Sequence, residues 1–185
     1  MATAKARAPG FPAEAGLTRV AAIAGVVVAA LALQTTLLAR LTLIGVIPQL
    51  VLVVVVSLAY LDGESVGVVT GFAGGLLIDL TSLQSIVGLT ALVYTLIGFG
   101  VGYLRQFATG ESVWTPVFAV ALASAIAEGS YALMSIILGQ PWVGIGFTAK
   151  VMGLVTLYNT LLTPFTFPLV RRVADRFRPE RVYRW

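Results

Sequence analysis

The chain has 185 residues, of which 58% are hydrophobic and only 11% are charged, so it has too few charges to coat a soluble domain. It contains neither Cys nor His, which excludes disulfides, thiolate nucleophiles, histidine metal ligands and Ser-His-Asp triads. The formal net charge of +4 points, in a membrane chain, to loop topology and anionic lipid and not to nucleic acid.

Apolar runs follow one another along the whole chain, and they do not alternate as transmembrane strands would. We therefore predict an all-α membrane protein in which six transmembrane helices form one domain over residues 20–170. A disordered cytoplasmic tail (1–19) precedes this domain and a basic cytoplasmic tail (171–185) follows it. The predicted helices are 20–38, 46–61, 65–80, 88–104, 113–138 and 149–170.

The first predicted helix also has features of a signal peptide, because basic residues precede it and Ala30-Leu31-Ala32 resembles a cleavage site. The apolar run continues past that point, which favours an uncleaved helix. The second and third runs are short, about 24 Å each as helix. Because only Asp62-Gly63-Glu64 separates them, we predict a tight helical hairpin, with a re-entrant pair as the alternative.

The distribution of Lys and Arg predicts the orientation of the helices. With both termini in the cytoplasm, only Arg40 and Lys150 of the 12 basic residues lie on the outer side. The others are cytoplasmic: Lys5, Arg7, Arg19, Arg105, Arg171, Arg172, Arg176, Arg178, Arg181 and Arg184.

A glycine ridge marks the third predicted helix. Gly67, Gly71 and Gly75 are four residues apart, so they lie on one face, where another backbone can approach closely. We expect this ridge to pack against a helix of the same chain, and the alternative is an interface for a partner.

Asp79 continues the same spacing at the outer end of that helix. A carboxylate in a bilayer normally finds a partner. Arg40 lies at a similar depth, so we predict an Asp79–Arg40 contact; the alternative is that Asp79 caps the turn at Thr81-Ser82.

Glu128 is the most deeply placed charge, about 15 Å from the outer end of the fifth helix by helical rise. Asn159 lies at the same depth on the sixth helix, and a hydrogen bond between the two would lower the cost of burying either. The predicted role is an interhelical polar pair, and the alternative is a site facing a substrate or partner.

The C-terminal tail is rich in arginine, with aromatic residues among the arginines. Such a segment anchors topology and binds anionic lipid, and docking of a cytoplasmic protein is an alternative. Arg171, Arg172, Arg176 and Arg178 are the predicted lipid-facing residues. No phosphate loop, metal-ligand cluster or nucleophile–base spacing is present in the sequence, so we predict no catalytic residues, no metal and no cofactor.

From Gln34 to Leu92 the chain resembles the MreD family, the integral-membrane component of the bacterial rod-shape machinery. The matching segments are Gln34-Thr35-Thr36-Leu37, Leu43-Ile44-Gly45-Val46-Ile47-Pro48, Gly71-Phe72-Ala73-Gly74-Gly75-Leu76-Leu77-Ile78-Asp79-Leu80 and Gly88-Leu89-Thr90-Ala91-Leu92. The family usually has Pro-Asp where this chain has Pro48-Gln49.

The resemblance implies a non-catalytic scaffold in the bacterial cytoplasmic membrane. Such proteins associate with MreC, a membrane-anchored periplasmic protein, and work with RodA, a class B penicillin-binding protein and MreB to direct side-wall peptidoglycan synthesis. The family is also similar in architecture to the substrate-binding subunits of energy-coupling-factor transporters. The alternative function is therefore a vitamin or small-molecule uptake subunit, which needs an outward-opening polar pocket.

Overall fold

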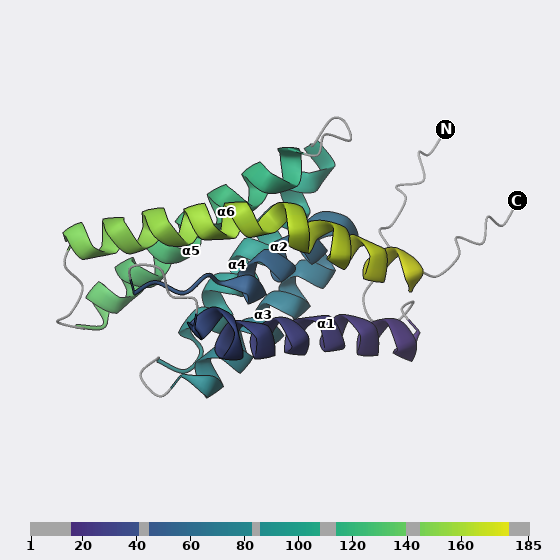
Figure 1. Ribbon diagram of the computed structural model, residues 1–185, viewed down its shortest axis with the longest axis horizontal. Helices are drawn as coiled ribbons and strands as arrows, with labels where there is room; N and C mark the ends of the chain where they lie inside the picture. The colour runs from purple at the N-terminus through teal and green to yellow at the C-terminus, as the bar shows by residue number, and fades with distance from the viewer. Residues whose placement is uncertain (1–15, 41–44, 83–85, 108–113, 140–144, 178–185) are drawn as a thin grey trace, which may run out of the picture.

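The computed structural model describes residues 16–40, 45–82, 86–107, 114–139 and 145–177, and their regular elements are helices (Figure 1). Within these ranges the α-helices are α1 (Leu17–Thr36), α2 (Leu50–Asp62), α3 (Glu64–Thr81), α4 (Leu89–Leu104), α5 (Trp114–Ile137) and α6 (Ile145–Arg176). Two short 3-10 helices, η1 (Leu38–Arg40) and η2 (Arg105–Phe107), follow α1 and α4.

Helix α2 forms the centre of the bundle and contacts each of the other five α-helices. Every residue from 51 to 59 is buried, so α2 is apolar all round and has no face for solvent or lipid. Its 13 residues span only about 20 Å, less than the hydrocarbon thickness of a bilayer. Helix α2 is therefore the core around which the longer helices pack.

In the part of the chain that the structure describes, four helices are long and apolar enough to cross a membrane: α1 with η1, α3, α5 and most of α6. This confirms the prediction of an all-helical protein with membrane-spanning character. Among the described residues α2 and α4 are shorter, with 13 and 16 residues. The predicted count of six spans thus goes beyond what helix length alone supports.

Gly63 joins α2 to α3, and the two helices form the tight hairpin that the short connection predicted. Its φ of 97° lies in the left-handed region, which an L side chain rarely adopts. The glycine ends α2 and begins α3 within one residue, which brings the two helices into contact.

Helix α6 is longer than predicted and continues into the basic segment as far as Arg176. Arg171 and Asp175 face each other one turn apart, with 3.6 Å between the guanidinium Nε and a carboxylate oxygen. This pair and the basic side chains near the C-terminal end of the helix dipole favour extension of the helix beyond the apolar stretch. At the other terminus, residues 17–19 of the predicted tail belong to α1, and residues 1–15 lie outside the described residues.

The start of α1 and the end of α6 lie at the same end of the bundle (Figure 1). We call this the terminal end. The opposite end, where α1 finishes and α2 begins, is called the far end below.

Candidate functional site

A cluster of polar side chains from five elements meets at the far end, with Gln49 at its centre. The Gln49 residue immediately precedes α2, and its backbone N–H donates to Asn159 Oδ1 of α6 at 2.9 Å. Its side-chain amide donates to the Glu128 carboxylate of α5 and accepts a bond from the Tyr94 hydroxyl of α4 at 3.1 Å. Gln49 therefore links α2 to three surrounding helices.

Gln34 on α1 adds a further contact to the start of α2. Its side-chain oxygen accepts a hydrogen bond from the backbone N–H of Val51 at 3.0 Å. The first N–H groups of a helix have no partner within it, and the start of α2 is buried among other helices. Side chains from α1 and α6 thus supply acceptors that water would supply in a soluble protein.

The predicted Glu128–Asn159 hydrogen bond is wrong in detail, because Gln49 lies between the two side chains. Asn159 is fully buried, and its amide N–H donates to Ser124 Oγ of α5 at 2.9 Å. The structure does bring the two residues into one polar cluster, because both bind Gln49. Gln49 was not predicted to join the cluster, because a polar residue next to a proline at the start of an apolar run is typical of a loop.

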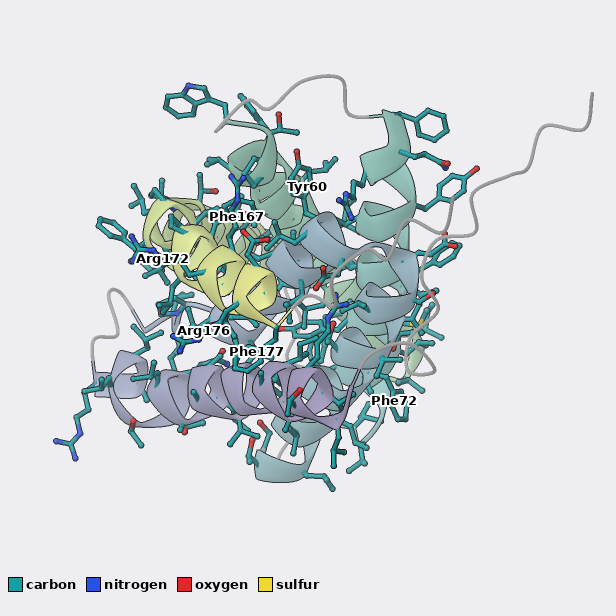
Figure 2. All side chains as sticks on the ribbon, turned by 90° about the vertical axis from the view of Figure 1, so that its right-hand side faces the viewer. Tyr60, Phe72, Phe167, Arg172, Arg176 and Phe177 are labelled. Carbon is teal, nitrogen blue, oxygen red and sulfur yellow. The ribbon has the colours of Figure 1, made fainter. Side chains whose placement is uncertain are left out.

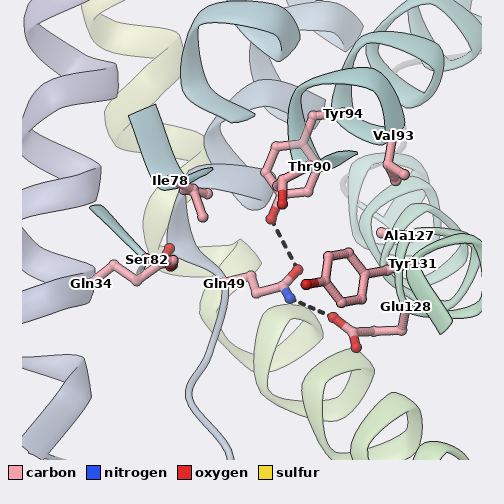
Figure 3. A pocket seen from close by; sticks show the side chains of 10 residues that line it. All are labelled: Gln34, Gln49, Ile78, Ser82, Thr90, Val93, Tyr94, Ala127, Glu128 and Tyr131. Carbon is pink, nitrogen blue, oxygen red and sulfur yellow. Dashed lines mark hydrogen bonds between the residues drawn. The ribbon is translucent and has the colours of Figure 1, made fainter. Parts of the chain in front are cut away.

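A pocket of about 200 Å³ opens beside this cluster (Figure 3). Its lining combines the polar cluster with a few apolar side chains: Gln34, Gln49, Ile78, Ser82, Thr90, Val93, Tyr94, Ala127, Glu128 and Tyr131. Pockets for drug-sized ligands have about 300–1,000 Å³. This one has room for a group of about side-chain size.

Asp79 is buried at the far end, and its position corrects the predicted contact with Arg40. Its Oδ2 accepts hydrogen bonds from the backbone N–H groups of Gly88, Thr90 and Ala91 at 2.8, 3.1 and 3.3 Å. Asp79 therefore caps the start of α4, and the left-handed conformation of Gly88 turns the chain so that these groups point at one oxygen. Arg40 is exposed, and no ion pair joins it to Asp79 in the described part of the chain.

The glycine ridge of α3 packs inside the molecule against α4. A Cβ atom added to Gly71 would overlap the backbone carbonyl of Tyr94, and one added to Gly75 would lie 2.5 Å from the Cα of Ala91. At Gly67 the obstacle is the carbonyl of Gly98. The ridge is thus a helix-packing surface, and the alternative of a partner interface on it is wrong.

Helix α4 contributes matching glycines that the sequence analysis did not single out. Gly98 meets the backbone of Gly67, and Gly102 meets that of Glu64. They are four residues apart on α4, the same spacing as the ridge on α3, and that repeat was the available signal. We call the contact between these two glycine rows the α3–α4 seam.

A buried ion pair at the terminal end was also missed. Arg19 of α1 and Asp62 at the end of α2 approach to 2.9 Å, and both side chains are at least nine-tenths buried. From the sequence, Arg19 is expected only to help set the orientation and Asp62 only to form part of a turn. Their pairing depends on the two helices running side by side in opposite directions, which sequence spacing does not reveal.

Three of the predicted lipid-facing arginines are described and lie at the terminal end, and Figure 2 looks onto Arg172 and Arg176 on the last turns of α6. Arg171, Arg172 and Arg176 are exposed, and Arg178 lies outside the described residues. Close by, the rings of Tyr60 and Phe167 pack edge to face at 5.9 Å between centroids. Exposed arginines beside half-buried aromatic rings are suited to the region where headgroups meet hydrocarbon.

No group of three or more potential metal-binding Asp or Glu side chains occurs in the ranges that the structure describes. The two carboxylates of the far end differ in environment, since Asp79 binds backbone N–H groups and Glu128 lines the pocket. The arrangement can therefore hold helices together and bind a small polar group.

Comparison with known proteins adds a single finding. No curated protein and no solved structure matches the chain significantly, so the similarity to transporter subunits stays a prediction. The family described as rod shape-determining protein MreD matches residues 17–173, from the start of α1 nearly to the end of α6. The chain belongs to the MreD family of rod shape-determining membrane proteins.

Proposed function

We propose that this protein is a non-catalytic scaffold of the rod-shape complex, in which it binds an MreC-like membrane-anchored periplasmic protein. In this role it helps to organise side-wall peptidoglycan synthesis by RodA and a class B penicillin-binding protein, with contact to these two direct or through the MreC-like protein. The observation that carries the proposal is the family match over residues 17–173. No cofactor enters the proposed role.

We further propose that the chain crosses the bacterial cytoplasmic membrane six times, with both termini in the cytoplasm. The excess of Lys and Arg on one side supports this orientation, as does the location of the start of α1 and the end of α6 at one end of the bundle. Reporter fusions after Asp62 and after Phe107 should report the cytoplasm, and a fusion after Ser82 the periplasm. A periplasmic signal after Asp62 would contradict the six-span topology.

The partner needs a helix face that the bundle leaves open, and the first half of α6 offers one. Gly146 and Gly153 lie seven residues apart on this helix, and a Cβ atom added to either meets nothing within 4 Å. Small residues let a second membrane helix approach closely. We propose this face for the membrane helix of the MreC-like partner.

Disulfide cross-linking can test the scaffold role and the face together, because the chain contains no Cys of its own. Gly153→Cys should form a cross-link to single cysteines along the partner's membrane helix. Gly25→Cys is the matched control, since this α1 glycine also has open space around it. Cross-links from Gly25 and none from Gly153 would move the interface to α1. Failure of the partner to co-purify at all would contradict the scaffold function.

The pocket at the far end is the observation that favours the alternative, a subunit for uptake of a vitamin or another small molecule. Its volume of about 200 Å³ is below the usual range for such ligands. Depletion of the protein in its host separates the two functions. We expect rounded or bulged cells, whereas vitamin auxotrophy together with recovery of an ATPase module would support uptake.

The exposed arginines of α6 complete the proposed function as an anchor to anionic lipid. Each basic residue near an anionic surface contributes about 1 kcal/mol. In the purified protein, the doubly substituted variant Arg172→Gln with Arg176→Gln should retain less phosphatidylglycerol than the wild type. Equal retention would show that these side chains do not bind anionic lipid.

A further inference from the structure

The polar groups that line the pocket at the far end favour a ligand of positive charge over one of negative charge. Among the described residues Glu128 is the one carboxylic acid that lines the pocket, and none of them that line it is Lys or Arg. Within the described residues no basic group lies within ion-pair distance of the Glu128 carboxylate. The only hydrogen-bond donor to this carboxylate there is the Gln49 amide, which binds Oε1, so Oε2 accepts no hydrogen bond from the described residues.

The other polar groups around the pocket add further acceptors. The Gln49 side-chain oxygen accepts from Tyr94, and it has a second lone pair. The Tyr131 hydroxyl points toward the Gln49 amide in Figure 3 and can also accept. A ligand that donates several hydrogen bonds and carries positive charge therefore complements this lining better than an anion or an apolar group.

Aromatic rings strengthen this preference. Tyr94 of α4 and Tyr131 of α5 both line the pocket near the Gln49 side-chain amide (Figure 3). Cations are attracted to the faces of aromatic rings, and more strongly where water is partly excluded. Tyr94 is almost fully buried, so its ring is a fixed part of the wall.

We propose that this pocket binds a primary ammonium group, with Glu128 as its counter-charge and with Gln49 and Tyr131 as acceptors for its remaining N–H groups. The volume of about 200 Å³ suits the headgroup of an ethanolamine phospholipid or a free alkylamine. Large apolar side chains are exposed on the surrounding helices at this end, Leu80 on α3 and Leu92 on α4 among them, and they provide a surface for an acyl chain. Such binding is separate from the scaffold function and does not depend on it.

Native mass spectrometry of the full chain, released from nanodiscs, tests the proposal. Discs of phosphatidylethanolamine, phosphatidylcholine or phosphatidylglycerol separate three headgroups: a zwitterionic one whose ammonium carries N–H donors, a zwitterionic one whose quaternary ammonium has none, and an anionic one without an ammonium. We expect phosphatidylethanolamine to be retained about tenfold better by the wild type than by Glu128→Gln, because a hydrogen bond to a charged group is lost. The control is Glu64→Gln, which makes the same change on an exposed residue at the terminal end and should retain the lipid fully.

A second variant keeps the test valid if Glu128→Gln does not fold. Tyr131→Phe removes one acceptor and keeps both the ring and the carboxylate, and it should lower retention of phosphatidylethanolamine by a smaller factor. Addition of ethylamine to the wild type in detergent distinguishes the two sources of ammonium. A Glu128-dependent rise in thermal midpoint without any lipid preference would identify a free amine.

Equal retention of the three lipids by the wild type and by Glu128→Gln, with no response to ethylamine, would overturn the proposal. A zero-length cross-link from Glu128 to a lysine of a partner protein would also overturn it, because the pocket would then serve a protein contact.

Discussion

Helix α4 lies against α3, and glycine backbone of one helix contacts backbone of the other over several turns. Helix α1, by contrast, buries a smaller share of its residues against the bundle. Within the apolar stretch of α1 only 17% of residues are buried, compared with 39% for α3. Three apolar side chains of α1 enter the core, Ile23, Val27 and Ala30, and one polar contact holds the helix near each end.

The difference shows two ways of attaching a helix where lipid surrounds the protein. Hydrocarbon solvates an apolar side chain as well as a neighbouring helix does, so burial of leucine gives little net drive. At the α3–α4 seam the glycines have no side chains, so the backbones of the two helices can pack directly against each other. Helix α1 instead relies on polar groups at its ends, which have few alternative partners in a bilayer.

The largest expected effect is on the seam. Gly71→Leu forces a side chain into the backbone of α4, and we expect a loss of about 4 kcal/mol or more in the free energy of unfolding. Little folded protein should be recovered from detergent, as judged by size-exclusion chromatography and thermal unfolding. Gly100→Leu on α4 is the control, because a Cβ atom there meets nothing within 4 Å. Equal stability of the two variants would mean that the seam is not close-packed.

The next largest effect concerns the terminal end of α1. Asp62→Leu leaves the buried Arg19 guanidinium without its carboxylate, and we expect a loss of about 3 kcal/mol in unfolding free energy, measured by denaturation in mixed micelles. The variant with both Arg19→Met and Asp62→Leu should regain most of that loss, because no charge then remains buried. If the double variant is as unstable as the single one, the pair does not act as a unit.

A smaller effect is expected where the seam ends. Asp79→Ala removes the acceptor for three backbone N–H groups at the start of α4 and should cost about 2 kcal/mol, within the range for a helix cap. Asp79→Asn keeps one acceptor oxygen and should lose less. Hydrogen exchange at Thr90 and Ala91 provides a local readout. Unchanged protection of both amides in Asp79→Ala would contradict the capping role.

The smallest effect concerns the far end of α1. Gln34→Ala leaves the Val51 N–H without its acceptor and should cost about 1 kcal/mol. Thr35→Ala makes a matched change on an exposed neighbour whose hydroxyl bonds only within α1. A thermal midpoint that falls equally in both variants would show that Gln34 does not hold α1 to α2.

Several features of the site could be predicted because they depend on local spacing or depth. The ridge at Gly67, Gly71 and Gly75 follows from helical geometry, and its close packing was expected. Glu128 and Asn159 were expected near each other from their matched positions along α5 and α6, and both bind Gln49. The chosen partners were less accurate: Asp79 binds the backbone of α4, and Gln49 separates Glu128 from Asn159. Each error concerned a contact between residues far apart in the chain.

By itself, the sequence determined that this protein is helical and apolar enough for a membrane. It also determined where the tight hairpin lies and which face of α3 carries glycines instead of side chains. These properties depend on composition and on a period of 3.6 residues, both of which are local. Only the tertiary structure decided that α2 is the shared core, that the ridge faces α4, and that Arg19 meets Asp62. Those outcomes depend on which helices become neighbours, and in an apolar chain many pairings bury similar surface, so polar groups and glycine contacts select among them.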